Sequence, residues 1–290
     1  MKVAGIEIGG TKLQIVSGNE FGVVDGREAH VIDASQGAVA IRNLIEQSLK
    51  KIGKVEAIGV GFGGPVNRET GEVWTSYHVE GWTGFNLSRW LEEVGRAPVV
   101  VENDANTAAL GEAVAGAGTG HRVVFYVTLG SGVGGGIVLD GEIYHGKLPG
   151  EVEFGHVRLD RTGKTVQDSC SGWAVNEKLR RMKLGEDARS LLPALEDGNK
   201  DAGRVFEEMT DDLAFGLSHI VHLFHPDTII IGGGLSFIGE PLRKAVADKL
   251  KSFVMDAFQP GPMIQLSKLK ADSVPVGALI LAGQYLKRSN

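Results

Sequence analysis

The sequence predicts an α/β protein with two similar lobes that face a central cleft. A strand, a glycine turn and a second strand open the chain, and the same unit recurs after residue 122. An internal repeat of this kind indicates two copies of one structural unit. Each copy leads into alternating helical and strand patterns, as in α/β proteins. The length of 290 residues is enough for two lobes and for a ligand site between them.

The first copy begins with three consecutive antiparallel strands, expected at 3–8, 13–16 and 29–32. Apolar residues at helical spacing predict a helix between 39 and 52. After it we expect a buried strand at 55–62, a helix at 87–94, a strand at 98–101 and a helix at 105–114. This copy forms the smaller lobe, residues 1–115.

The second copy begins with strands expected at 123–129, 135–139 and 143–144. A long amphipathic helix at 202–224 stops before Pro226, and a strand at 228–231 follows. Helices are expected at 239–253 and 276–286. We expect this copy to form the larger lobe, residues 116–275. The last helix, within 276–290, is expected to return to the first lobe, and Gly111 to Gly120 reads as a hinge.

Composition and charge exclude several classes of protein. Hydrophobic residues make up 42% and charged residues 23% of the chain, which excludes a disordered or coiled-coil protein. The net charge of -6 provides no basic field for nucleic acid or an anionic membrane. The single cysteine, Cys170, excludes an internal disulfide, and neither a signal peptide nor a membrane-spanning stretch is recognised. We therefore expect a cytoplasmic protein.

Glycine is unusually frequent in this chain, since its 42 residues are about twice the ordinary usage. Gly9, Gly10, Thr11 and Lys12 form the first glycine turn between two strands. Glycines let backbone N–H groups approach phosphate oxygens, while Thr11 donates a hydrogen bond and Lys12 supplies a charge. An ordinary hairpin turn with a surface lysine is an equal alternative for the turn taken alone. The spacing is not that of a P-loop.

The second turn, Gly130, Ser131 and Gly132, opens a G-x-G-x-x-G match. A dinucleotide-binding loop needs a helix directly after the glycines, but a strand and a turn are predicted there, which disfavours NAD. A second phosphate-binding turn fits better. A third cluster, Gly232, Gly233 and Gly234, follows a strand and would let a nucleoside lie against the backbone; a close packing point between helix and strand is equally compatible.

Two segments carry candidate catalytic and sugar-binding groups. Asn103 and Asp104 follow a buried strand. Asp104 is either the N-cap of the next helix or a general base for a sugar hydroxyl, and the two phosphate turns favour the base. Glu153 and His156 are candidate sugar contacts, because adjacent hydroxyls are recognised by fixed carboxylates and imidazoles. A solvated strand and a structural histidine are the alternatives.

Five segments in this order resemble the ROK family of sugar kinases, within the actin-like, hexokinase-like ATPase superfamily. They are Glu7-Ile8-Gly9-Gly10-Thr11-Lys12, Gly61-Phe62-Gly63-Gly64-Pro65-Val66, Glu102-Asn103-Asp104-Ala105-Asn106, Leu129-Gly130-Ser131-Gly132-Val133-Gly134 and Glu153-Phe154-Gly155-His156. The resemblance implies the actin-like, ribonuclease H-like fold with duplicated mixed β-sheets. It also implies transfer of the γ-phosphoryl group of ATP, with Mg²⁺, to the 6-hydroxyl of a hexose, glucose by family default. It further implies a homodimer, with the nucleotide-binding and dimerisation surfaces on the larger lobe, 116–275.

The same resemblance assigns roles to single residues. Asp104 would be the catalytic base, and Gly64, Asn103, Glu153 and His156 would contact the sugar. The turns at Gly9–Lys12 and Gly130–Gly134 would hold the ATP phosphates, with Gly232 to Gly234 near the adenosine. Glu7, which replaces the commoner Asp, would hold a water of Mg²⁺.

The sequence departs from the family pattern at three points, and two of them leave the identity of the sugar substrate undetermined. The cysteine cluster of zinc-containing members is absent, so we expect no structural zinc or other protein-bound metal. Gln167, with Asp168 beside it, stands where a sugar-binding glutamate is usual, and His78 lies where an Asn-Leu pair is usual. Fructose, mannose, glucosamine and N-acetylmannosamine remain alternative substrates, and the phosphoryl donor is not fixed. A ROK-type sugar sensor is a further alternative; such regulators carry an N-terminal helix-turn-helix, whereas here the first strand starts at Val3.

Overall fold

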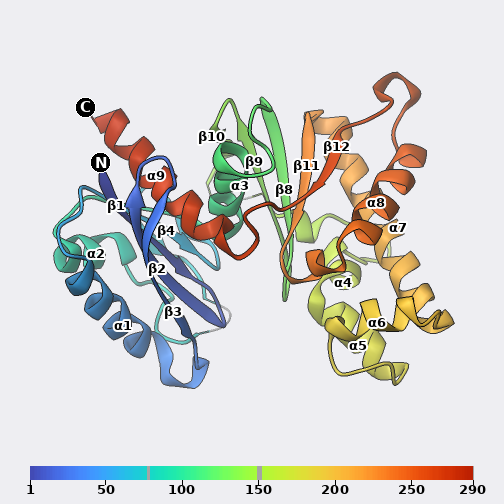
Figure 1. Ribbon diagram of the computed structural model, residues 1–290, viewed down its shortest axis with the longest axis horizontal. Helices are drawn as coiled ribbons and strands as arrows, with labels where there is room; N and C mark the ends of the chain where they lie inside the picture. The colour runs from blue at the N-terminus through green and yellow to red at the C-terminus, as the bar shows by residue number, and fades with distance from the viewer. Residues whose placement is uncertain (77–78, 149–151, 290) are drawn as a thin grey trace. The chain divides into compact units, whose positions relative to one another are not determined.

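The computed structural model describes residues 1–76, 79–148 and 152–289. Its contacts divide the chain into two compact units (Figure 1). Unit 1 comprises Met1–Thr119, Gly141–Glu151 and Ala271–Asn290, and unit 2 comprises Gly120–Asp140 and Val152–Lys270. The N-terminal strands and the C-terminal helix thus belong to the same unit. No helix in the described part of the chain is long and apolar enough to cross a membrane.

Unit 1 is built on a mixed sheet with the strand order β3-β2-β1-β4-β7. Its strands are β1 (Lys2–Ile8), β2 (Lys12–Asn19), β3 (Val24–Val31), β4 (Ile58–Phe62) and β7 (Val99–Asn103), and β5 (Val66–Asn67) and β6 (Glu72–Val73) form a separate hairpin. The first three strands are antiparallel, as predicted, and β4 and β7 run parallel to β1.

Helices cover both faces of this sheet. They are α1 (Gly37–Ile52), α2 (Leu87–Gly95), α3 (Asp104–Ala115) and α9 (Ser273–Ser289), and one 3₁₀ turn, η1 (Ala34–Gln36), precedes α1. Ile45 of α1 shares a buried cluster with Ile15 of β2, whereas Leu279 of α9 packs with Val16. Because successive strand residues point to opposite faces, α1 and α9 lie on opposite sides of the sheet.

Unit 2 repeats the same plan with β8 (Val123–Leu129), β9 (Val133–Leu139), β11 (Thr228–Gly232) and β12 (Met263–Leu266) in the order β9-β8-β11-β12. The short strand β10 (Glu142–Ile143) follows β9 in the chain. The helices are α4 (Val166–Cys170), α5 (Gly172–Arg181), α6 (Leu191–Glu196), α7 (Lys200–Phe224) and α8 (Glu240–Phe253), with 3₁₀ turns η2 (Phe154–His156), η3 (Ala188–Ser190), η4 (Gly234–Ile238), η5 (Asp256–Phe258) and, in the connection to α9, η6 (Lys270–Asp272).

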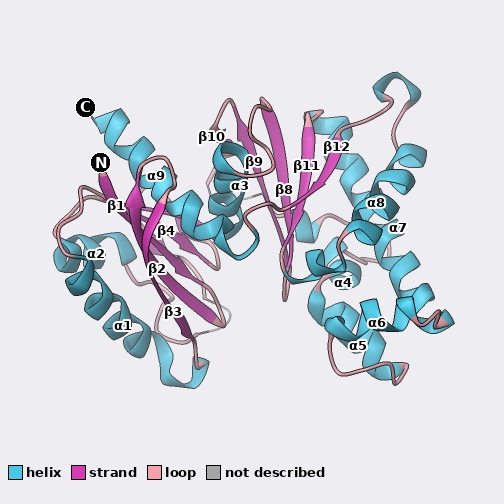
Figure 2. Ribbon diagram, viewed as in Figure 1, coloured by secondary structure: helices cyan, strands magenta, loops and turns pink. Residues whose placement is uncertain are grey.

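The predicted duplication of mixed sheets is confirmed (Figure 2). In each unit an antiparallel hairpin, β1-β2 or β8-β9, is extended by two parallel strands on the side of its first strand. The strand predicted after the second glycine turn is present as β9, so the helix that a dinucleotide fingerprint requires is absent there.

One prediction needs correction, and one strand of the sheet was missed. Residues Gly111 to Ala115, predicted as part of a hinge, are the last turns of α3, so only 116–120 lack helical structure. Gly111 serves a close helix contact instead: a Cβ atom there would lie 2.3 Å from Ser273 O, and one on Gly277 would lie 1.8 Å from Thr107 O. The parallel strand β12 was not predicted, because four residues are too few for a clear alternating pattern.

Candidate functional site

In unit 1, three neighbouring parallel strands end in line. Ile8 of β1 pairs with Phe62 of β4, and Phe62 pairs with Asn103 of β7. The residues directly after these are Gly9, Gly63 and Asp104. A Cβ atom on Gly63 would lie 3.4 Å from both Asp104 Oδ2 and Gly9 Cα. The candidate base and the first phosphate turn therefore lie on either side of Gly63, at the carboxyl edge of the sheet where α/β proteins bind ligands.

The first glycine turn closes by a hydrogen bond from Gly9 N to Lys12 O of 2.9 Å. Lys12 Nζ lies 3.0 Å from Glu7 Oε2, and Gln14 Nε2 donates to the same oxygen at 2.7 Å. Both contacts fix the Glu7 carboxylate beside the turn. The positive charge predicted for phosphate is thus paired with Glu7 in this structure.

Asn103, not Asp104, caps α3. Asn103 Oδ1 accepts hydrogen bonds from Ala105 N and Asn106 N, and Asn103 Nδ2 donates to Gly64 O at 3.4 Å. The N-cap alternative for Asp104 is therefore wrong: Asp104 is the first helical residue. At that position a carboxylate lies near the positive end of the helix dipole. The hydrogen bond to Gly64 O links Asn103 to a second residue that is expected to contact the sugar.

Glu102, which the sequence did not single out, holds Asn103 and Asn106 in place by hydrogen bonds. Its carboxylate is buried, with Oε1 accepting from Asn103 N at 2.8 Å and from Asn106 Nδ2 at 3.1 Å. His145 Nε2 lies 2.5 Å from the other oxygen, Oε2. The sequence does contain one sign of this role. Glu102 is a charged residue near the end of an apolar strand, and such a group is rarely buried without a partner.

In unit 2, three predicted segments meet at Val133. The second glycine turn closes by a hydrogen bond from Gly130 N to Gly132 O of 3.0 Å. Val133 N then donates to Gln167 Oε1 at 3.0 Å. A Cβ atom on Gly155, between Glu153 and His156, would lie 2.3 Å from Val133 O. The second phosphate turn is therefore adjacent to the candidate sugar-binding residues of η2 and α4.

Glu153 and His156 are exposed, on either side of the buried Phe154 and Gly155. Phe154 anchors η2 by an edge contact with Phe125, with ring centroids 5.4 Å apart. A buried ring between two exposed polar groups holds them at the surface of unit 2, as a ligand contact requires.

Asp168 is committed to local structure. Its Oδ2 accepts from Thr165 N at 2.9 Å and from Thr165 Oγ1 at 2.7 Å, which completes a capping box at α4. The Thr165 hydrogen bonds hold the pKa of Asp168 below its usual range. Asp168 therefore does not stand in for the negative charge that Gln167 lacks.

The three glycines of the third cluster differ in how much space surrounds them. Gly233 has a φ of 78° and packs against Leu129, where an added Cβ would lie 2.5 Å from the carbonyl carbon; a Cβ on Gly232 would lie 2.2 Å from the Tyr126 hydroxyl. Both therefore serve the close packing that was the alternative prediction. Only at Gly234 of the three would a Cβ meet nothing within 4 Å, so Gly234 leaves room for a ligand.

The turn at residues 160–164, which follows η2, is closed by its own hydrogen bonds. Asp160 Oδ1 accepts from Thr162 N, Thr162 Oγ1, Gly163 N and Lys164 N at 2.7 to 3.2 Å. The described residues contain no group of three or more His, Cys, Asp or Glu side chains placed to hold a metal ion. His78 lies outside the described residues.

Comparisons with known proteins identify the family of this chain. The model of the ROK family matches residues 3–285. A glucokinase of Streptomyces coelicolor is 32% identical over 83% of this chain and 86% of its own. The crystal structure of a ROK hexokinase from Thermus thermophilus superposes with a TM-score of 0.88 at 26% identity, covering 99% of this chain and 100% of that one.

A ROK family glucokinase from Streptomyces griseus, solved in complex with glucose and AMPPNP, has a TM-score of 0.85 at 27% identity, covering 98% of this chain and 100% of that one. The match to the family model spans nearly the whole chain, and this protein belongs to the ROK family.

Proposed function

We propose that this ROK protein is an ATP-dependent sugar kinase that phosphorylates the 6-hydroxyl of a hexose, with glucose as the first candidate. The observation that carries the proposal is the position of Asp104, whose carboxylate lies next to Gly63 and across it from the first phosphate turn. Phosphoryl transfer needs a base close to bound phosphates, and little other covalent chemistry from the protein. The similarity to glucokinases supports the choice of glucose.

The residues present fit a bound nucleotide. At Gly130 an added Cβ would meet nothing closer than 3.9 Å, so the backbone of the second turn is accessible to phosphate oxygens. Lys12 and Thr11 lie at the first turn, with Thr11 exposed. We propose that Gly9, Gly10, Thr11, Lys12, Gly130, Ser131 and Gly132 hold phosphates and that Gly232, Gly233 and Gly234 lie near the adenosine, with Gly234 as the residue open to a ligand.

The donor set also fits Mg²⁺, which takes one or two carboxylates plus phosphate oxygens and waters. Glu7 presents a carboxylate fixed on Oε2 by Lys12 and Gln14, and we propose that it holds a metal-bound water. Bound Mg²⁺ would neutralise charge on the phosphates. The Mg²⁺ requirement, the homodimer and the lobes 1–115 with 276–290 and 116–275 stay predictions.

In the proposed reaction Asp104 accepts the proton of the 6-hydroxyl as that oxygen attacks the γ-phosphorus, and the bond to the β,γ-bridging oxygen breaks to release ADP. We propose that Glu153, His156, Asn103 and the Gly64 backbone bind sugar hydroxyls. Because Gln167 Oε1 already accepts from Val133 N, its amide Nε2 is the group that would donate to the sugar.

Replacement of Asp104 by Asn tests this assignment. We expect kcat to fall about 100-fold to 10,000-fold, the usual contribution of a general base, with nucleotide and sugar dissociation constants within about twofold. Asp33→Asn is the matched control, because Asp33 caps an exposed turn of unit 1 and Asn caps equally well. Near-normal kcat in Asp104→Asn would refute the role of Asp104.

A coupled ADP-release assay tests the substrate. Glucose, mannose, fructose, glucosamine and N-acetylmannosamine are compared by kcat/KM, and glucose is expected to give the largest value. A larger value for another sugar would correct the glucose assignment. Release of ADP with none of them, by protein that binds nucleotide, would contradict the proposed kinase activity.

A further inference from the structure

The side chain of Gln167, a residue of α4, contacts the second phosphate turn. Val133 N donates to Gln167 Oε1 at 3.0 Å, and the same oxygen would lie only 2.7 Å from a Cβ atom on Gly132. Since the backbone N–H is a donor, the carbonyl end of the Gln167 amide must face the turn. One side chain therefore fixes the point where the turn enters β9.

The N-terminus of α5 fixes the other side of the turn. Gly172 N donates to Gly130 O at 2.7 Å, and Trp173 N donates to Ser131 O at 3.3 Å. In a trans peptide the N–H points opposite to the C=O of the same unit. The N–H groups of Ser131 and Gly132 therefore point away from α5, in the orientation that an anion-binding turn requires.

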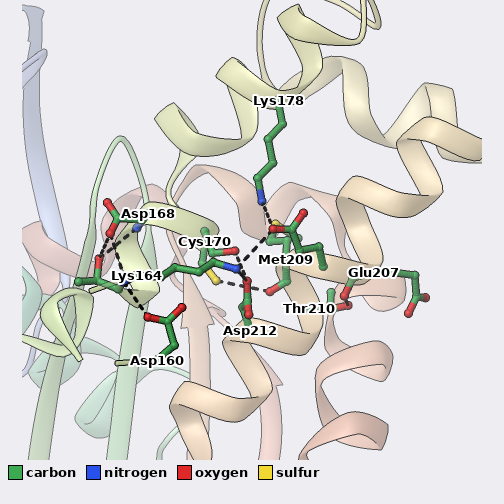
Figure 3. Close-up of polar contacts among 12 residues, drawn as sticks. Asp160, Lys164, Asp168, Cys170, Lys178, Glu207, Met209, Thr210 and Asp212 are labelled. Atoms are coloured by element: carbon green, nitrogen blue, oxygen red, sulfur yellow. Dashed lines mark hydrogen bonds and ion pairs between the residues drawn. The ribbon is translucent and has the colours of Figure 1, made fainter. Parts of the chain in front are cut away.

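Gln167 keeps its place only if α4 does, and α4 has five residues. A helix this short is not stable by itself. Two contacts anchor α4 to α7. Lys164 Nζ, just before α4, lies 2.6 Å from Asp212 Oδ2 (Figure 3). Ser169 Oγ of α4 donates to the same oxygen. The buried Cys170 packs beside them, with its sulfur 3.4 Å from Met209 O. A continuous set of contacts thus runs from Asp212 through α4 to Val133.

We propose that Gln167 is a positioning residue of the nucleotide site, which orients the second phosphate turn through Val133 N, and that Asp212 anchors the helix that carries it. The inference rests on the proposed function in one respect, that the ligand of this turn is a nucleotide phosphate. It adds a role for the Gln167 side chain that is independent of the sugar. The acceptor oxygen at position 167 is what the turn needs, whether it belongs to an amide or to a carboxylate.

Isothermal titration with Mg²⁺ and AMPPNP, without sugar, tests the proposal on the full chain. Gln167→Leu removes the acceptor and is expected to bind AMPPNP about three- to tenfold more weakly, the value of one hydrogen bond. Gln167→Glu keeps an acceptor oxygen and is expected to bind within about twofold of the unaltered protein. Gln167→Met, which keeps the length of the side chain, replaces the leucine variant if that variant does not fold.

Hydrogen exchange of the peptide that contains Val133 gives a readout without ligand. It is expected to be faster in Gln167→Leu than in Gln167→Glu, at similar melting temperatures. Asp212→Asn should weaken AMPPNP binding about two- to fivefold by loosening α4, whereas Asp211→Asn, its exposed neighbour on α7, should not.

The outcomes separate the two proposals. Failure of the unaltered protein to bind AMPPNP would overturn the proposed function. Normal binding by the unaltered protein and equally tight binding by Gln167→Leu, or equal weakening in the leucine and glutamate variants, would overturn the positioning role alone.

Discussion

His145→Ala is expected to destabilise unit 1, because it removes the donor to a buried carboxylate oxygen. Glu102 is 3% exposed, and its Oε2 contacts His145 Nε2 at 2.5 Å while Oε1 is occupied by Asn103 N and Asn106 Nδ2. Both side chains belong to unit 1. The pair also ties the segment after β10 to the end of β7, two residues before the proposed base Asp104.

The magnitude follows from the environment of that oxygen. A buried polar group left without its partner costs about 1–3 kcal/mol, and more when it is charged. The His145 side chain is 28% exposed, so water reaches the vacated position and offsets part of the loss. We therefore expect about 2 kcal/mol, which corresponds to a fall in Tm of about 4–8 °C for a domain of ordinary size.

Urea unfolding followed by tryptophan fluorescence measures this change. Trp74, Trp82 and Trp90 lie in unit 1 and only Trp173 lies in unit 2, so the signal reports mainly on unit 1. His145→Gln places an amide donor near the position of Nε2 and is expected to recover most of the loss. His121→Ala, a half-exposed histidine of unit 2, is the matched control and should leave the transition unchanged. Equal midpoints for His145→Ala and His121→Ala would refute the reasoning, as would a glutamine variant no more stable than the alanine variant.

Three further predictions concern stability and reactivity. Asn103→Ala should cost about 1 kcal/mol through loss of the α3 cap, measured by the same urea titration; an unchanged midpoint would contradict the capping role. Gly277→Ala should cost several kcal/mol, because its Cβ would lie 1.8 Å from Thr107 O, and a fully stable variant would show that α9 shifts freely. Burial raises the pKa of the Cys170 thiol far above its usual range, so a thiol reagent at pH 8 should label it only in denaturant. The thiol then ionises only in the unfolded chain, and stability should fall as pH rises above about 8.5, by up to about 1.4 kcal/mol per pH unit; Cys170→Ala should lack this part of the dependence.

The sequence was sufficient to predict the helices and strands whose apolar residues recur regularly or whose ends are marked by a proline or a glycine turn. The long helix expected at 202–224 is α7 (Lys200–Phe224), and the strand expected at 123–129 is β8 with those same bounds. The repeat of strand and turn predicted the duplicated sheets, because each copy carries its pattern locally. The strand β12 and the short helices α4 and α6 were not predicted, since segments of four to six residues show too little periodicity.

Within the candidate site, the sequence determines which residues follow the strands, and the tertiary structure determines their hydrogen-bond partners. The order of strand, glycine turn and polar residue determined that Gly9 and Asp104 each follow the end of a strand, and parallel strands present their carboxyl ends at one edge. Only the tertiary structure decided that Asn103 takes the cap, that Glu102 pairs with His145 across 43 positions and that Val133 N meets Gln167 across 34. A residue's spacing fixes the face it occupies on its own element, but a hydrogen-bond partner distant in the chain is selected by the packing that brings two elements together.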